Sequence, residues 1–435
     1  MALYRRELSE GVFFNHLHTD RFKSAYFSVN FLLPLAKESA AYYAILPRIL
    51  CRGCTRYPDQ RAISRRLEEL YGADISTRNF KRGEMQVIGF SLDVLDNQYL
   101  PAGENTDLLR ETFALFRDIL LDPYMEGGTF RPEYVESERK NAMDTVRALI
   151  NNNHRYAVNR AQAEMCRGEA SGVSVDGRVE DYEGMSAARL LDYYRRMLSS
   201  ARIEVFYVGG EGVEKVEALA ASLFADLARG EVIYPTTDVI RRADECREVE
   251  ESVPAAQGVL AVGFRTGTTI LDDDYFALSL FVEIFGGSPS SKLFMNVRER
   301  LSLCYFCYAT DEPIKGIMLA VAGIKNENRK LAKSEILAQL ESIVNGEFSD
   351  EEFSFAKKSL CSASRAISDN PRGLESWYVR RAGAGKILSP EEARACVERV
   401  SREDVCRVAA KISLDTVYFL RGIAGAEDEE VEEDE

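Results

Sequence analysis

Runs of apolar residues at strand and helix spacing divide the chain into two series of elements. The first series opens with Ser24–Leu35, "SAYFSVNFLLPL", whose β-branched and aromatic residues are typical of a buried strand. Two strand-like runs on either side of Arg82 and Gly83 predict a hairpin, and "RIEVFYVGG" predicts a closing strand. Helices are predicted at about Ser39–Cys51, Gln60–Gly72, Asp107–Leu121, Pro132–Ile150, Tyr156–Cys166, Ser186–Leu198 and Val213–Arg229.

The second series repeats this order. It opens with the strand "QGVLAVGFRTG", continues with helices at about Asp273–Phe285 and Ser291–Arg300, and adds the strands "CYFCYATDE" and "GIMLAVAGIK". Gly286-Gly287 is interpreted as a helix break, because no strand leads into it and no Lys-Ser or Lys-Thr follows, as a phosphate-binding loop requires. Three or four further helices precede the closing strand "TVYFLRGI".

The closing helix–strand units of the two series, "ARLLDYYRRMLSSARIEVFYVGG" and "REDVCRVAAKISLDTVYFLRG", match at a period of about 210 residues, which is too long for a solenoid. We therefore predict an α+β protein of two homologous halves, each an antiparallel sheet covered on one face by helices. The predicted domains are residues 1–232 and 251–425. The polar stretch within 233–250 is the predicted linker, and 426–435 is a predicted disordered acidic tail.

Composition narrows the class of protein. The net charge is −15, but the last nine residues, "EDEEVEEDE", hold eight acids, so the body carries only about −7. No basic stripe with interleaved aromatic residues points to nucleic acid. No apolar run reaches the length of a membrane span, and the N-terminus lacks the apolar core of a signal peptide. We expect a cytoplasmic protein whose nine scattered Cys are reduced.

Three His offer little for metal binding. His16 and His18 lie on one face of a possible strand without a nearby carboxylate or Cys, which makes a poor zinc site and favours a polar pair at a strand edge. His154 stands alone in "NNNHRYA".

The order of the elements resembles the insulinase-like (M16) peptidases. "TDRFKS", "LPRILCRGCTRYPD" and "NNNHRYAVNRAQAEMC" further resemble a zinc-less, non-catalytic bacterial subgroup of that family. Active members carry His-x-x-Glu-His ahead of a short turn, and the resemblance places Ala44, Pro47 and Arg48 at its three chemical positions. A third ligand, a Glu, falls at Thr145. None of these side chains is a usual zinc ligand, Arg48 would repel a cation, and Pro47 caps or kinks the helix. We therefore expect neither metal nor catalytic residues in this chain.

The segment "SSKLFMNVRERLSLCYFCYA" resembles the part of the family's second half in which an Arg and a Tyr line the substrate chamber. These residues are Arg298 and Tyr305. An Arg fork and a phenol can both donate hydrogen bonds to a peptide carbonyl that gains charge in the transition state. The alternative is that neither residue binds substrate. In that case Arg298 is a surface residue of a helix and Tyr305 belongs to the core of a strand.

Two Cys-x-x-Cys pairs, Cys51–Cys54 and Cys304–Cys307, together match a four-Cys zinc site. On a regular strand, however, residues three apart point to opposite faces, which argues against a joint role for Cys304 and Cys307. Cys51 and Cys54 lie at a helix end. Buried free thiols are the expected state of both pairs.

The resemblance implies a function in a pair. In such systems a zinc-less chain forms a heterodimer with a zinc-bearing M16 subunit, which supplies the zinc while the zinc-less chain supplies the Arg/Tyr pair for a peptide substrate. A homodimer is the alternative for the chain alone. The competing function is a scaffold or peptide-binding homologue without a role in proteolysis. A stand-alone peptidase requires ligands that this chain lacks.

Overall fold

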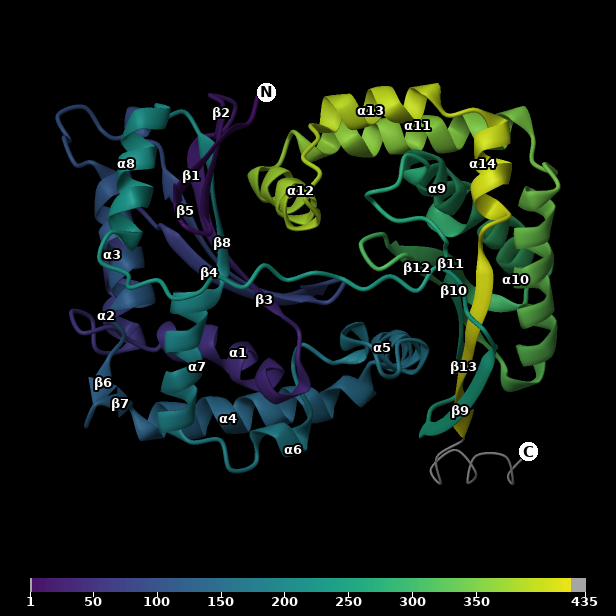
Figure 1. Cartoon of the computed structure of the whole chain (residues 1–435), viewed down its shortest axis with the longest axis horizontal. Coiled ribbons are helices and arrows are strands. Elements are labelled where there is room, and N and C mark those ends of the chain that lie inside the picture. Colours follow the sequence, from purple (N-terminus) through teal and green to yellow (C-terminus); the bar gives the residue numbers. More distant parts are fainter. Residues whose placement is uncertain (1, 424–435) are drawn as a thin grey trace, which may run out of the picture. The chain divides into compact units, whose positions relative to one another are not determined.

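The computed structural model describes residues 2–423, so the predicted acidic tail, 426–435, lies outside the described residues. The chain forms two compact units (Figure 1). The first comprises the chain up to Arg147, Val173–Thr236 and Asp369–Ser389, and the second comprises Ala148–Gly172, Thr237–Ser368 and the chain from Pro390. Both units are discontinuous. They differ from the continuous ranges expected from the sequence by two exchanged segments.

A six-stranded sheet forms the centre of the first unit. In spatial order its strands are β1 (Tyr4–Ser9), β2 (Val12–His18), β8 (Arg202–Gly209), β3 (Ser24–Pro34), β5 (Met85–Leu95) and β4 (Asp74–Arg82). Neighbours run antiparallel except β2 and β8, which are parallel. The predicted hairpin is confirmed, because Arg82 pairs with Met85 around Gly83, whose φ is 56°. β1 was not predicted, since its sequence "YRRELS" is mostly polar and exposed.

The main helical layer covers one face of this sheet. It contains α1 (Lys37–Leu50), α2 (Gln60–Glu69), α3 (Leu108–Leu121), α4 (Pro132–Arg147), α6 (Val179–Tyr182), α7 (Ala187–Ser200) and α8 (Val213–Phe224), with a short hairpin of β6 (Met125–Glu126) and β7 (Thr129–Phe130). Phe27, Val29 and Phe31 alternate along β3 into this core. The residues between them are polar and serve the opposite face.

A five-stranded sheet forms the centre of the second unit. In spatial order its strands are β11 (Cys304–Glu312), β12 (Ile317–Ile324), β10 (Gly258–Arg265), β13 (Ser413–Ile423) and β9 (Arg247–Pro254). The helices on its main face are α9 (Tyr275–Val282), α10 (Arg329–Val344), α11 (Asp350–Ile367), α13 (Pro390–Arg399) and α14 (Arg402–Ala409), together with two π-helical segments, η4 (Glu283–Gly287) and η5 (Leu293–Arg300). Within residues 2–423, no helix combines the length and the apolar character that a bilayer crossing demands.

The two sheets confirm the repeat. The strand order β4-β5-β3-β8-β2 in the first unit matches β11-β12-β10-β13-β9 in the second, and each ends in a parallel pair. β9 begins inside the stretch predicted as the linker. Its sequence "REVEESVP" is charged and mostly exposed, so it does not predict a strand. The strand pairs only with β13.

One helix from each half is exchanged. α5 (Asn153–Met165) comes from the first half of the sequence but packs on β10, β12 and β13 of the second unit. α12 (Pro371–Ala384) comes from the second half and packs on β3 and β8 of the first unit. Each sheet is therefore covered on both faces, by a helical layer on one and by a single exchanged helix on the other.

A buried carboxylate on α12 holds it against the first sheet. Glu375 has no exposed surface, and its Oε1 accepts hydrogen bonds from Ser28 Oγ at 3.0 Å and Asn30 Nδ2 at 2.8 Å. The Arg78 guanidinium forms an ion pair with the same oxygen at 2.6 Å. These partners explain the polar residues of β3.

Glu169, just after α5, serves the second unit in the same way. Its carboxylate receives the guanidinium of Arg265 at 2.6 Å and Lys315 Nζ at 2.6 Å. Arg265 is only 1% exposed and also donates from Nε to Asp415 at 2.8 Å. A buried charge needs such partners to be tolerated, so both exchanged segments are tied to their sheets by specific ion pairs.

Candidate functional site

The helix that the family resemblance aligns with the zinc motif carries no metal-binding side chain at the three aligned positions. α1 buries most of its residues and runs through Pro47, which is itself buried, for one further turn. Ala44 is half-buried and Arg48 is exposed. A methyl group, a pyrrolidine ring and a guanidinium thus stand where the family's active members place two imidazoles and a carboxylate, and none of the three can ligate zinc.

The position of the third ligand is equally unsuited to a metal. Thr145 lies exposed on α4, which packs against α1, and its hydroxyl donates to the Asn141 carbonyl at 2.7 Å. Its neighbour Asp144 pairs with Arg147 at 3.2 Å. Over residues 2–423, no cluster of three or more His, Cys, Asp or Glu is arranged to hold a metal ion. The residues present do not fit the zinc that the family's active members carry.

Arg298 lies near the end of η5 and is held from one side. Its guanidinium carbon is 4.6 Å from the centre of the Phe294 ring, one turn earlier, a cation–π contact that restricts the side chain. Its Nε is 3.5 Å from Glu299 Oε1, and 40% of the side chain remains exposed. The side chain is therefore partly accessible to a ligand.

Tyr305 occupies a β-bulge near the start of β11. Cys304 pairs with Ile324 and Phe306 with Gly323, so Tyr305 is an extra residue with no partner on β12. Because β11 is the edge strand, the bulge directs Tyr305 outwards, and the residue is 56% exposed. The alternative reading of Tyr305 as strand core is therefore wrong.

Arg298 and Tyr305 are joined by a tight turn. The helix ends at Arg300, and Ser302 takes a left-handed backbone with φ of 50° before β11 begins. Both side chains thus come from one short helix–turn–strand junction of the second unit. The arrangement presents a guanidinium and a phenol to solvent and supplies no base, nucleophile or metal ligand.

The same bulge corrects the expectation for Cys304 and Cys307. The extra residue shifts the alternation of side chains, so both cysteines pack against the core beneath α9 and α10, whereas Phe306 and Tyr308 pack on the face of α5. The two side chains therefore lie on one face of the strand, and each thiol affects the pKa of the other. Sequence periodicity could not show this, because it assumes a strand without insertions.

Cys54 is buried and Cys51 is half-buried at the end of α1. Burial raises the pKa of Cys51 to about 12 and also raises the pKa of Cys54. Neither thiol therefore has the lowered pKa that is typical of a reactive cysteine.

His16 and His154 make structural contacts, whereas His18 lies exposed at the end of β2. His16 is buried on β2, stacks on Tyr207 with ring centres 5.1 Å apart and bonds the Glu211 carbonyl through Nε2 at 3.0 Å, and its burial lowers its pKa. The predicted strand-edge location of the His16/His18 pair is wrong, because β2 lies between β1 and β8. His154 on α5 bonds the Tyr308 hydroxyl at 2.6 Å.

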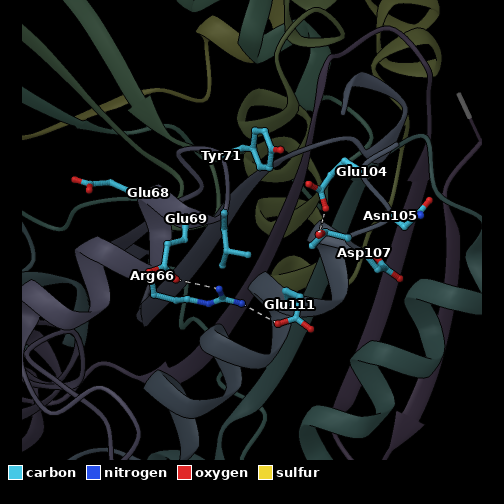
Figure 2. Close-up of a pocket in the computed structure, with 10 residues that line it drawn as sticks. Arg66, Glu68, Glu69, Tyr71, Glu104, Asn105, Asp107 and Glu111 are labelled. Atoms are coloured by element: carbon cyan, nitrogen blue, oxygen red, sulfur yellow. Dashed lines mark hydrogen bonds and ion pairs between the residues drawn. The ribbon is translucent and has the colours of Figure 1, made fainter. Parts of the chain in front are cut away.

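An open hollow of about 680 Å³ lies elsewhere, between the end of α2 and the start of α3 (Figure 2). Its wall is acidic, and Arg66 within it bridges Glu69 at 3.2 Å and Glu111 at 2.8 Å. None of the residues predicted for the site lines this hollow. Its carboxylates are spread along the rim, so it offers no defined ligand site.

Comparisons with known proteins agree with this reading of the residues. Residues 184–360 match the family described as Peptidase M16 inactive domain. The chain is 30% identical over 408 residues to a probable inactive metalloprotease, YmfF, of Bacillus subtilis (strain 168), covering 94% of this chain and 95% of that protein.

Solved structures share the whole fold. A conserved protein from Enterococcus faecalis V583 has a TM-score of 0.88 at 26% identity, over 97% of this chain and 99% of that one. A peptidase M16 inactive domain from Pseudomonas fluorescens has a TM-score of 0.81 at 17% identity, over 98% and 99%.

Proposed function

Because this chain belongs to the M16 peptidase family as an inactive homologue, we propose that it is the non-catalytic subunit of a heterodimeric zinc peptidase. In this proposal a zinc-bearing M16 subunit supplies the metal and the attacking water. This chain supplies Arg298 and Tyr305, which bind the peptide substrate from the opposite side. The complex acts in the bacterial cytoplasm.

The observation that carries the proposal is the contrast between the two candidate sites. At Ala44, Pro47, Arg48 and Thr145 every chemical function is missing. At Arg298 and Tyr305, two hydrogen-bond donors are exposed on one junction and oriented by a cation–π contact and a β-bulge. Donors fixed in advance around a carbonyl stabilise the charge that develops on its oxygen during hydrolysis.

The experiment first identifies the partner by co-purification from the native cell and then measures turnover of a long, flexible peptide by the reconstituted pair. Losing one fixed donor costs about 10²–10³ in kcat, so we expect losses of this size for Arg298→Ala and for Tyr305→Phe. Arg298→Lys should recover little, because Lys lacks the planar fork. The dissociation constant between the subunits should not change.

Arg300→Ala is the matched control. Arg300 ends the same helix, is exposed and pairs with Glu335 at 3.3 Å, so its loss should leave turnover near that of the wild type. Near-wild-type turnover in the Arg298 and Tyr305 variants as well would contradict the proposal and favour a scaffold or peptide-binding role.

A further inference from the structure

Cys304 and Cys307 form a pair with unequal surroundings. Cys304 is half-buried at the start of the edge strand β11, whereas Cys307 is only 4% exposed beneath the helical layer. Because of the Tyr305 bulge, both cysteines pack against the same core, on the same face of the strand. The geometry therefore provides one partly exposed thiol and a second, protected thiol on one face of β11.

The pKa values of the two thiols also differ: the more exposed thiol has the lowered pKa and the buried thiol the raised one. The neighbouring Cys307 thiol and the positive charge of Arg298 lower the pKa of Cys304, although burial opposes this. The Cys304 thiol and burial together raise the pKa of Cys307. An accessible thiolate beside an Arg is the usual setting of a reactive cysteine, and the protonated partner behind it can resolve a mixed disulfide.

We propose that Cys304 and Cys307 are a redox-active dithiol, which a low-molecular-weight disulfide oxidises to an intrachain disulfide across the Tyr305 bulge. The Cys304 thiolate attacks one sulfur of the small disulfide, so that a mixed disulfide forms and one small thiolate leaves. Cys307 then attacks the Cys304 sulfur and expels the second small thiolate, which takes up the Cys307 proton. In total, two protein thiols are oxidised and one small disulfide is reduced to two thiols.

Closing the disulfide requires a local change in β11, because Cys304 and Cys307 both pair with β12 and a disulfide needs its two Cα atoms about 4.4–6.8 Å apart. β11 pairs with β12 on one side only, and the bulge leaves Tyr305 without a ladder partner, so Tyr305 is the point at which the backbone can adjust. Closure would fix the backbone on both sides of Tyr305 and remove the thiolate beside Arg298. An effect of closure on peptide binding by Arg298 and Tyr305 rests on the proposed function, whereas the thiol chemistry does not.

The test uses the full chain alone, reduced and then incubated with glutathione disulfide. Free thiols are blocked with an alkylating reagent, and peptides are identified by mass spectrometry. We expect the peptide containing residues 304–307 to become lighter by two hydrogens. In Cys307→Ser the reaction should stop at a glutathione adduct on Cys304, and in Cys304→Ser neither the link nor an adduct at Cys307 should form.

Cys361→Ser is the matched control. Cys361 is half-buried on α11 of the same unit, and burial raises its pKa, so its loss should leave the 304–307 link unchanged. A fully oxidised sample without this link would overturn the proposal, as would an adduct in Cys307→Ser that forms on other cysteines and not on Cys304.

A second measurement needs no variant and therefore does not depend on the variants folding. The wild-type chain is alkylated with iodoacetamide near neutral pH, and the rate is followed peptide by peptide. We expect Cys304 to react several-fold faster than Cys361, because a larger fraction of Cys304 is thiolate. Equal rates would count against the dithiol. Neither measurement involves a partner or a substrate, so failure here is distinct from failure of the proposed peptidase role.

Discussion

At the scale of residues, the sharpest feature is the pair of carboxylates that hold the exchanged segments. Glu375 lies on α12 and Glu169 just after α5, and each is paired with cations of the unit that it joins. Replacing both members of such a pair by apolar groups is often tolerated, but removing one leaves an uncompensated charge. These glutamates therefore specify where α12 and the end of α5 bind.

We predict that Glu375→Ala lowers the free energy of unfolding by about 3 kcal/mol, since Arg78 would lose its partner in a largely buried setting. Urea unfolding followed by circular dichroism measures the change. The control is Glu136→Ala, which breaks an exposed pair with Arg139 at 2.8 Å and should change the free energy far less than Glu375→Ala does. Equal effects for the two variants would show that Glu375 is no anchor.

The pH dependence of unfolding tests the second anchor. Burial alone would raise the pKa of Glu169, but hydrogen bonds from Arg265 and Lys315 outweigh it and hold the pKa below its usual value of 4.5. A lowered pKa contributes stability that is present above the unfolded value and is lost as pH falls through the folded value. Glu169→Gln should therefore be less stable than the wild type at neutral pH, and this difference should narrow below pH 4.5. A difference that is constant with pH would rule out the ionic contribution.

At the scale of elements, the junction that carries Arg298 and Tyr305 depends on two irregular features. They are the π-helical segment η4 and the β-bulge at Tyr305 in β11, and η4 packs against β11. η4 continues α9 as a π-helical turn, so the helix ends at Gly287, one residue later than the predicted break begins. Gly286 packs directly on β11, where an added Cβ would lie 2.5 Å from the Ala309 nitrogen. This close contact supports the strand that carries Tyr305 and both cysteines.

We expect Gly286→Ala to destabilise the chain by about 1–3 kcal/mol, because either β11 or η4 must move to admit the methyl group. Gly287→Ala is the matched control, since its added Cβ would meet the flexible end of Glu283 at 2.6 Å rather than strand backbone. Urea unfolding of both variants measures the difference. A smaller loss for Gly286→Ala than for Gly287→Ala would mean that the contact with β11 is not restrictive.

Regular elements were predictable from the sequence, and irregular ones were not. Alternation and helical periodicity located Ser24–Pro34, the β4–β5 hairpin and most helices, because these segments bury apolar residues at fixed spacing. The β9 strand could not be predicted because its residues are charged. The Tyr305 bulge could not be predicted because a single inserted residue leaves no local signal in the sequence. Without the bulge, the sequence could not show that Cys304 and Cys307 share a face.

At the scale of the whole molecule, the reciprocal exchange makes the two units mutually dependent. The sequence of a helix shows which face is apolar but not which sheet that face will meet, so α5 and α12 were assigned to the halves in which they occur. The structure places each with the other half's sheet. Neither half of the sequence therefore contains all the residues that its sheet buries.

The last prediction follows from this dependence. A fragment ending at Thr236 keeps the first sheet but lacks α12, so Ser28, Asn30 and Arg78 lose the carboxylate that binds them. Buried polar groups without partners are costly, and we expect this fragment to unfold without the sharp transition of the intact chain.

A synthetic peptide of residues 369–389, which contains α12, should bind the fragment and restore a cooperative transition, whereas the same peptide with Glu375→Ala should not. Thermal unfolding followed by circular dichroism, with and without each peptide, distinguishes the outcomes. A fragment that alone unfolds as sharply, and at the same temperature, as the intact chain would show that α12 adds nothing to the first unit. Equal rescue by both peptides would mean that the apolar face of α12 suffices, and that Glu375 selects its position without determining whether it binds.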